Sequence, residues 1–306
     1  LKSGYYDEYA GFIDNVLEHF ANKGYEFDYL SPVNEPQWDW SKPGQEGTAA
    51  TNEDIYLFSK YLTEKLRSRK LNTKLAVGEA GDIRLLTGHS YFTTWPVETL
   101  VTTRKKLRNK LDEVESLEYW QTEFCILEES PEIGSGHKRD LGINTALYVA
   151  RVIHADLTIA NASSWQWWTS LTTWDYKDGL IYLDTGDKSD LFNRDRMKYD
   201  GEVRESKLLW AFGNFSRFIT PGMTRIEATV DDKEVAVSAF KEGEKCVMVL
   251  INYSQKAQKL TLPKEFQAET SFLTDQKNSL DQMQISNGAI KLPKRSVMTL
   301  IGKMNT

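Results

Sequence analysis

Two glutamates of this chain each stand at the end of an apolar run. Glu35 comes two residues after the run 27–33, and Glu123 lies near the end of the run 117–124. A parallel α/β barrel places its reactive side chains at the carboxyl ends of its strands. Two carboxyl groups facing one bond can divide acid/base and nucleophilic roles, which is the chemistry of glycoside hydrolysis. The pair, with the flat apolar ring of Trp38 close to the first acid, therefore predicts a site that cleaves glycosidic bonds.

Each glutamate taken alone also has a simpler explanation. The Asn34-Glu35-Pro36 triplet could be an ordinary turn, and Glu123 could form a salt bridge at the rim of a barrel. Pro36 fixes its own φ and disfavours a helical backbone at the preceding residue, so we expect Glu35 to be extended. The catalytic interpretation is favoured because both glutamates end strands within one alternation of strands and helices.

Apolar periodicity predicts five strands that alternate with helices in the first two thirds of the chain. Such alternation implies a parallel sheet with right-handed crossovers, and a closed (β/α)8 barrel needs eight strand–helix units. We therefore expect an α/β fold of the parallel-barrel type over residues 1–221, with five of the eight units visible in the sequence. The expected strands are 27–33, 75–78, a short one around 89–92, 117–124 and 163–168.

The character of the sequence changes after Pro221-Gly222. Short apolar or alternating runs follow, among them 235–240, 246–251 and 296–301, and turn-forming residues such as Asn287-Gly288 separate some of them. This pattern predicts a small antiparallel β-sandwich over residues 222–306.

Several stretches resemble glycoside hydrolase family 30, within the clan A retaining glycosidases. The resemblance implies that Glu35 is the acid/base on the fourth strand of a barrel and that Glu123 is the nucleophile on the seventh. It also implies three further strand–helix units upstream, where this chain has none. Residues 1–221 would then be the C-terminal five units of a (β/α)8 TIM barrel, incomplete at the N-terminus, and would form an open arc. The stretches that carry the resemblance are Ser31-Pro-Val-Asn-Glu-Pro36, Gly88-His-Ser-Tyr91, Trp120-Gln-Thr-Glu123, Trp165-Gln-Trp-Trp168 and 216–222.

The same resemblance implies a set of substrate-binding side chains. The Asn34 amide would bond the sugar 2-hydroxyl, although an Asn can also simply form a turn, and the Tyr91 hydroxyl would orient the nucleophile. Trp165 would stack under the sugar, and Trp168 would point outward into the helix layer. The full set is Asn34, Trp38, His89, Tyr91, Trp165 and Trp167, of which His89 could equally be structural.

The loop after the first glutamate bears on the substrate. Trp38-Asp39-Trp40 followed by Gln45-Glu46-Gly47 resembles the endo-β-1,6-galactanase branch of the family. Glucuronoxylan is the alternative polysaccharide, and an exo-acting β-glucosidase or β-xylosidase is a further one. A non-catalytic carbohydrate-binding remnant is the alternative of another class. Glu79 and Asp82 form a third acidic strand tip, which could bind sugar hydroxyls or pair with basic residues.

Composition restricts the remaining functions. The net charge of −6 argues against a nucleic-acid partner, and the sequence contains no apolar run of membrane-spanning length. The four histidines and two cysteines lack metal-ligand spacing, so no metal or other cofactor is expected. Cys125 and Cys246 are expected to be free, buried thiols. We expect a monomer that is secreted, periplasmic or at the cell surface. The sequence opens at Leu1 without a Met, so we expect that its N-terminus is missing and that the signal peptide is missing with it.

Overall fold

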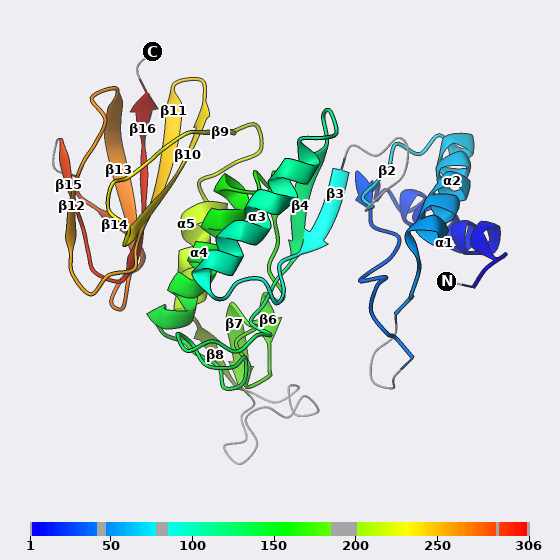
Figure 1. Ribbon diagram of the computed structural model, residues 1–306, viewed down its shortest axis with the longest axis horizontal. Coiled ribbons are helices and arrows are strands. Elements are labelled where there is room, and N and C mark those ends of the chain that lie inside the picture. Colours follow the sequence, from blue (N-terminus) through cyan, green and yellow to red (C-terminus); the bar gives the residue numbers. More distant parts are fainter. Residues whose placement is uncertain (1, 42–46, 78–84, 185–200, 286–287, 305–306) are drawn as a thin grey trace. The chain divides into compact units, whose positions relative to one another are not determined.

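The computed structural model describes residues 2–41, 47–77, 85–184, 201–285 and 288–304 (Figure 1). The chain divides into two compact units. Unit 1 holds residues 1–88 and 109–122, and unit 2 holds residues 89–108 and 123–306. Among the described residues, no helix is long and apolar enough to cross a membrane.

Unit 1 begins with the predicted alternation of helices and strands. Helix α1 (Tyr6–Ala21) packs against helix α2 (Asn52–Arg69) through a small apolar core. Strand β1 (Tyr29–Leu30) pairs in parallel with β2 (Lys74–Leu75), as a strand–helix–strand unit requires. The core contains Ala10, Leu17, Phe58, Leu62 and Leu66.

The start of α2 shows how the sequence sets an element boundary. The Thr51 hydroxyl accepts a hydrogen bond from the Asp54 backbone N–H, and the Asp54 carboxylate accepts one from the Thr51 backbone N–H. This reciprocal pair is a capping box, which satisfies backbone donors that a helix start leaves unpaired. Helix α2, which the spacing of its apolar residues predicted, therefore begins directly after its N-cap residue, Thr51.

Two further strands lead to the second glutamate. Strand β3 spans Leu85–His89, and strand β4 spans Glu118–Glu123, so the strand predicted at 117–124 does carry Glu123 at its end. Within unit 1, the Thr122 hydroxyl donates to the Gly88 carbonyl at 3.4 Å. The boundary between the units falls inside both strands, after Gly88 and after Thr122. Helix α3 (Val97–Leu111) connects them in sequence.

Unit 2 is built around one almost completely buried helix. Helix α4 (Ile143–Thr158) buries residues on all its sides, which is expected of a helix enclosed by other elements. It is followed by strand β5 (Ser164–Trp165), and helix α5 (Lys207–Ser216) packs beside it. A three-stranded sheet lies between these elements in sequence, made of β6 (Leu171–Thr172), β7 (Ile181–Asp184) and β8 (Glu202–Glu205).

The C-terminal strands form the predicted antiparallel structure. A six-stranded sheet has the order β14-β13-β16-β11-β10-β9, and a two-stranded sheet pairs β12 with β15. Apolar side chains from both sheets meet in one core, so the two sheets make a sandwich. The strands are β9 (Thr224–Ile226), β10 (Val235–Glu242), β11 (Lys245–Asn252), β12 (Gln258–Thr261), β13 (Phe266–Thr274), β14 (Ser279–Met283), β15 (Ala289–Leu292) and β16 (Ser296–Met304).

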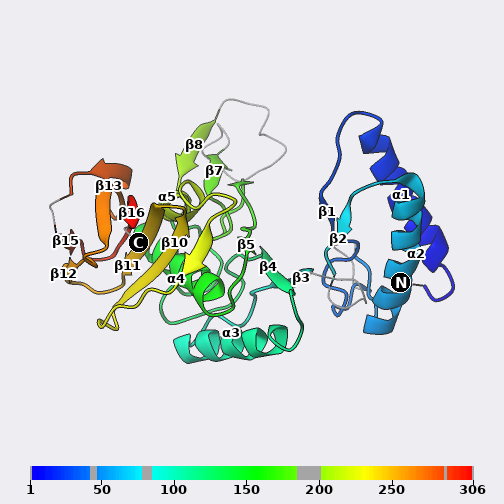
Figure 2. The same cartoon turned by 90° about the horizontal axis from the view of Figure 1, so that it is seen from above.

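Strand β11 contributes to two different cores. Val247 and Val249 belong to the apolar cluster that includes α4 and α5, whereas Met248 and Leu250 belong to the core of the sandwich. Alternation along the strand places these residues on opposite faces of the sheet. The larger sheet is therefore buried on both faces, and α4 and α5 lie against it (Figure 2).

These observations confirm an α/β chain with a C-terminal antiparallel sheet. Two interpretations remain predictions. One is that the first five strands form an open arc of a barrel, and the other is that residue 221 is a domain boundary. Cys125 and Cys246 are free and buried, as expected.

Candidate active site

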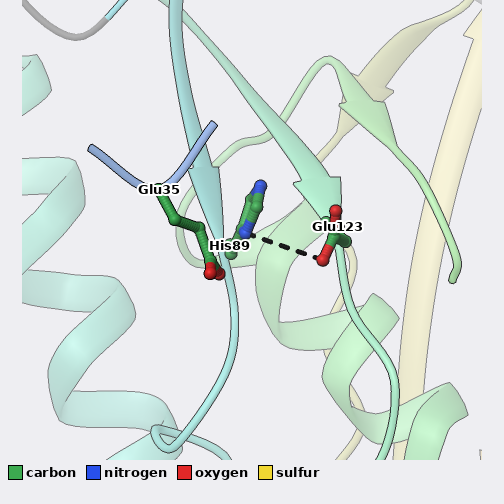
Figure 3. Close-up of side chains that lie close together, drawn as sticks. All are labelled: Glu35, His89 and Glu123. Carbon is green, nitrogen blue, oxygen red and sulfur yellow. Dashed lines mark ion pairs between the residues drawn. The ribbon is translucent and has the colours of Figure 1, made fainter. Parts of the chain in front are cut away.

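Glu123 lies at the tip of β4 and its carboxylate is held from one side. The Tyr91 hydroxyl donates to its Oε1 at 2.8 Å. Nδ1 of His89 lies 3.9 Å from the same oxygen (Figure 3). The Glu123 side chain is 24% exposed and that of His89 is 18% exposed, so solvent or a ligand can still reach both. The three residues belong to unit 2, and the contact between Tyr91 and Glu123 is the one expected from the sequence.

The protonation of Tyr91 follows from its surroundings. Burial raises the pKa of the Tyr91 hydroxyl far above its usual value, and the neighbouring Cys125 thiol and Glu123 carboxylate raise it further. Tyr91 therefore keeps its proton and acts as a hydrogen-bond donor over the whole working pH range. Burial also raises the pKa of Cys125 to about 12, so this thiol stays protonated and is not a competing nucleophile.

Glu35 lies in unit 1 in a tight turn, and the expected extended backbone is wrong. Its φ is 41°, in the left-handed region. The Glu35 carbonyl accepts hydrogen bonds from the Trp38 backbone N–H at 2.9 Å and from the Trp40 indole at 3.1 Å. These two bonds close the turn, and they override the weaker bias that Pro36 exerts on the residue before it.

The loop around this glutamate exposes other predicted site residues. Asn34 is exposed, and Trp38 is 56% exposed, so its ring face is open to a ligand. Gly47 lies so close to the Trp40 ring that an added Cβ would come within 2.0 Å of it. Gly47 is therefore required for the packing of the Trp40 ring. Gln45 and Glu46, and the acidic tip with Glu79 and Asp82, lie outside the described residues.

The tryptophans after α4 divide differently from the prediction. The Trp165 ring packs against Phe124 and Phe212, and its indole N–H donates to Asp156 of α4 at 2.9 Å. Trp165 thus faces the helices, which is the position expected for Trp168. Trp167 stacks parallel to Trp165 and donates its indole N–H to the Asp178 carbonyl at 2.8 Å.

Trp168 was expected to point outward into the helix layer, and the structure exposes it instead. It is 53% exposed, and its backbone N–H donates to the Phe124 carbonyl at 2.9 Å, directly after Glu123. A large apolar ring open to solvent beside a candidate nucleophile is a suitable surface for a sugar face. Alternation along the strand separates Trp168 from Trp165 and Trp167, and this was the available signal.

Comparison with known proteins places this chain in a family. The sequence model of O-Glycosyl hydrolase family 30 matches residues 1–87 and 83–182. The chain belongs to this family, and it is a glycoside hydrolase.

Solved structures agree with this assignment. A conserved exported protein from Bacteroides fragilis is 30% identical, with a TM-score of 0.88 over 98% of this chain and 70% of that chain. The glycoside hydrolase family 30 subfamily 8 xylanase from Clostridium acetobutylicum is 21% identical, with a TM-score of 0.69 over 99% of this chain and 73% of that chain. An endo-beta1,6-glucanase is 17% identical, with a TM-score of 0.64 over 100% of this chain and 64% of that chain. The last two likenesses concern the fold alone.

Proposed function

We propose that this protein is a retaining glycoside hydrolase in which Glu123 is the nucleophile and Glu35 is the acid/base. The observation that carries the proposal is the hydrogen bond from Tyr91 to Oε1 of Glu123. Within unit 2, the described contacts of Tyr91 and His89 both reach this one oxygen. The carboxylate is thereby oriented so that Oε2 can attack the anomeric carbon of the sugar.

The hydrogen bond also suits the two steps of the reaction. In the first step, the Glu123 carboxylate forms a covalent bond to the anomeric carbon while Glu35 gives a proton to the leaving oxygen. In the second, Glu35 takes a proton from water, which displaces Glu123 with a second inversion, so the configuration is retained. Tyr91 is a neutral donor and leaves the negative charge on the nucleophile.

The stereochemical outcome tests this mechanism. We expect NMR of the first-formed product to show the anomeric configuration of the substrate. An inverted product, or an experimental structure with the two carboxyl groups separated by about 7 Å or more, would contradict the retaining mechanism, because that spacing admits a water between them.

We propose a β-linked polysaccharide as the substrate, with β-1,6-galactan as the preferred one. The support is the Trp38-Asp39-Trp40 loop, its resemblance to galactanases and its packing against Gly47. Two exposed tryptophans, Trp38 and Trp168, offer flat surfaces for sugar rings. Two of the similar structures are a xylanase and an endo-β-1,6-glucanase, so xylan and β-1,6-glucan are the competing backbones.

A substrate panel distinguishes these candidates. The full-length gene product is incubated with β-1,6-galactan, glucuronoxylan, β-1,6-glucan and aryl β-glucosides and β-xylosides, and new reducing ends are measured. The fastest release is expected from β-1,6-galactan. Faster cleavage of another polysaccharide would make that polysaccharide the preferred substrate in place of β-1,6-galactan. A preference for the aryl glycosides would indicate exo action. Binding of galactan without any release would favour the non-catalytic alternative.

We further propose that the protein is exported and acts as a monomer. Export is supported by the description of the Bacteroides fragilis relative as an exported protein. A polysaccharide too large to enter a cell also requires an enzyme outside it. Fractionation of the producing cells and size-exclusion chromatography of the purified protein test the two statements.

A further inference from the structure

A buried ion pair lies behind the strand ends that flank the candidate nucleophile. Asp156 of α4 and Arg104 of α3 are 1% and 2% exposed, and Nε of Arg104 lies 2.7 Å from Oδ1 of Asp156. Arg104 also donates to the carbonyl of Thr93 at 2.6 Å and to its hydroxyl at 2.7 Å. Neither charge is needed to form the helices, and a carboxylate in the last turn of a helix opposes the helix dipole.

Stability alone is a weak explanation for this pair. Removing two charges from water costs several kcal/mol for each ion, and well-packed apolar side chains often serve a protein core equally well. The alternative explanation is geometric, because an ion pair with directed hydrogen bonds fixes its partners more tightly than apolar packing does. The partners of Asp156 therefore decide between the two explanations.

The second oxygen of Asp156 is bonded to two strand ends. Oδ2 accepts from the Ser90 hydroxyl at 3.0 Å and from the Trp165 indole at 2.9 Å. Ser90 directly follows β3, and Trp165 is the last residue of β5. One carboxylate, held by Arg104, therefore fixes the ends of two different strands.

Both strand ends are in turn bonded to the segment that carries Glu123. The Ser90 backbone N–H donates to the Glu123 carbonyl at 3.3 Å, and Tyr91, the next residue, donates its hydroxyl to the Glu123 carboxylate. On the other side, the Trp165 ring packs on Phe124. Asp156 is thus linked to the main chain and, through the Ser90–Tyr91 segment, to the side chain of the candidate nucleophile.

We propose that Asp156 is a positioning residue for this glycosidase, with Arg104 as its anchor and Ser90 as its main link to Glu123. It does not touch the sugar. Asp156 fixes the positions of Tyr91 and Glu123. Loss of the Asp156 carboxylate therefore lowers the rate of the chemical step and leaves substrate binding almost unchanged. This inference rests on the proposed function of Glu123.

The test compares two buried serines that each bond a side chain of α4. Ser90→Ala removes the bond to Asp156. Ser238, in strand β10 of the sandwich, shares a hydrogen bond of 2.8 Å with Nδ1 of His154, and Ser238→Ala removes it. The two serines are 3% and 1% exposed, so the substitutions are matched in size, burial and helix partner.

We expect Ser90→Ala to lower kcat about tenfold with KM within about twofold of the wild type, since small displacements of reacting groups cost rate steeply. Both serine variants should lower Tm by similar amounts. Ser238→Ala, however, should leave kcat unchanged. Asp156→Asn should lower kcat further, to about one hundredth, and Ser90→Ala serves as the milder variant if Asp156→Asn does not fold. Wild-type kcat in Ser90→Ala, or equal kcat losses in both serine variants, would overturn the proposal.

Crystal structures of the same variants give a reading that does not depend on turnover. The distance from the Tyr91 hydroxyl to the Glu123 carboxylate should lengthen in Ser90→Ala and stay at 2.8 Å in Ser238→Ala. An unchanged distance in Ser90→Ala would reject the positioning role. If the wild type cleaves no glycan at all, the proposed function fails, and these structures still decide whether Asp156 positions Glu123.

Discussion

The two candidate catalytic glutamates are fixed in different ways. At Glu123, the described contacts reach the carboxylate itself, through Tyr91 and His89. At Glu35, the described contacts within unit 1 reach the backbone, because its carbonyl accepts from Trp38 and Trp40. The contact at the Glu123 carboxylate suits the proposed role of nucleophile. A nucleophile must aim one oxygen at one carbon, whereas an acid/base must serve a leaving oxygen and then a water.

The largest effect on activity is expected when the Glu123 carboxylate is removed. Glu123→Gln should lower kcat by at least about 10³-fold without loss of folding, because the amide cannot act as the proposed nucleophile. Azide added to Glu123→Ala should restore turnover and give a product of inverted configuration. Glu118→Gln, at the exposed start of the same strand, is the control and should behave like the wild type. Substantial turnover in Glu123→Gln would show that another residue attacks the sugar.

Removal of the other glutamate should have a smaller effect that depends on the substrate. Glu35→Gln should lower kcat roughly 10²- to 10⁴-fold on polysaccharide, the usual contribution of a general acid or base. The loss should shrink for aryl glycosides, whose leaving groups need little protonation. Azide should restore activity to Glu35→Ala with the configuration retained. The same loss for good and poor leaving groups would argue against an acid/base role.

A third test addresses the hydrogen bond from Tyr91 to the Glu123 carboxylate. Tyr91→Phe removes a hydrogen bond to a charged group, which is worth about 1.5–3 kcal/mol, and should lower kcat roughly 10- to 100-fold. Tyr148→Phe is the matched control, because its buried hydroxyl bonds Thr94 at 2.8 Å instead.

The pH dependence of the Tyr91→Phe variant gives a second reading. The pKa of Tyr91 is raised by burial, so its hydroxyl does not lose its proton at working pH. The alkaline side of the pH profile should therefore be the same in Tyr91→Phe as in the wild type. A shift of that side would mean that Tyr91 titrates during catalysis.

The smallest effects are expected for the tryptophans. Trp168→Ala should raise KM roughly tenfold with Tm almost unchanged, because an exposed ring contributes to ligand contact more than to packing. Trp165→Phe should instead lower Tm and kcat with little change in KM, because it loses the bond to Asp156. Measured kinetics and melting curves of the two variants compare the roles directly. If KM rose in Trp165→Phe and not in Trp168→Ala, Trp165 would be the residue that stacks against the sugar.

Much of the site around Glu123 could be predicted from the sequence. The apolar run that begins at Leu117 predicted a strand that carries Glu123 at its end, and β4 ends there. The contact from Tyr91 to Glu123 was expected from the resemblance alone, and it is present. Local patterns suffice here because the end of a strand depends mostly on its own residues.

Two details depended on bonds that no local pattern encodes. The backbone of Glu35 is left-handed because its carbonyl is bonded by Trp38 and Trp40, and a neighbouring proline could not reveal those bonds. Alternation placed Trp165 and Trp167 on one face of the strand, and their rings do stack. It could not say which face meets the helices, because that depends on the partner that Asp156 provides for the Trp165 indole.

Strand β11, with Val249 in one core and Met248 in the other, also bears on how such chains can be recombined. A sandwich of this kind cannot be exchanged for that of a distant relative by a cut at Pro221-Gly222. The outer face of its larger sheet would arrive shaped for different helices, and α4 and α5 would lose the surface that covers them. Homologous exchange should therefore succeed only when the helices and the sheet are inherited together, as a single piece of the gene.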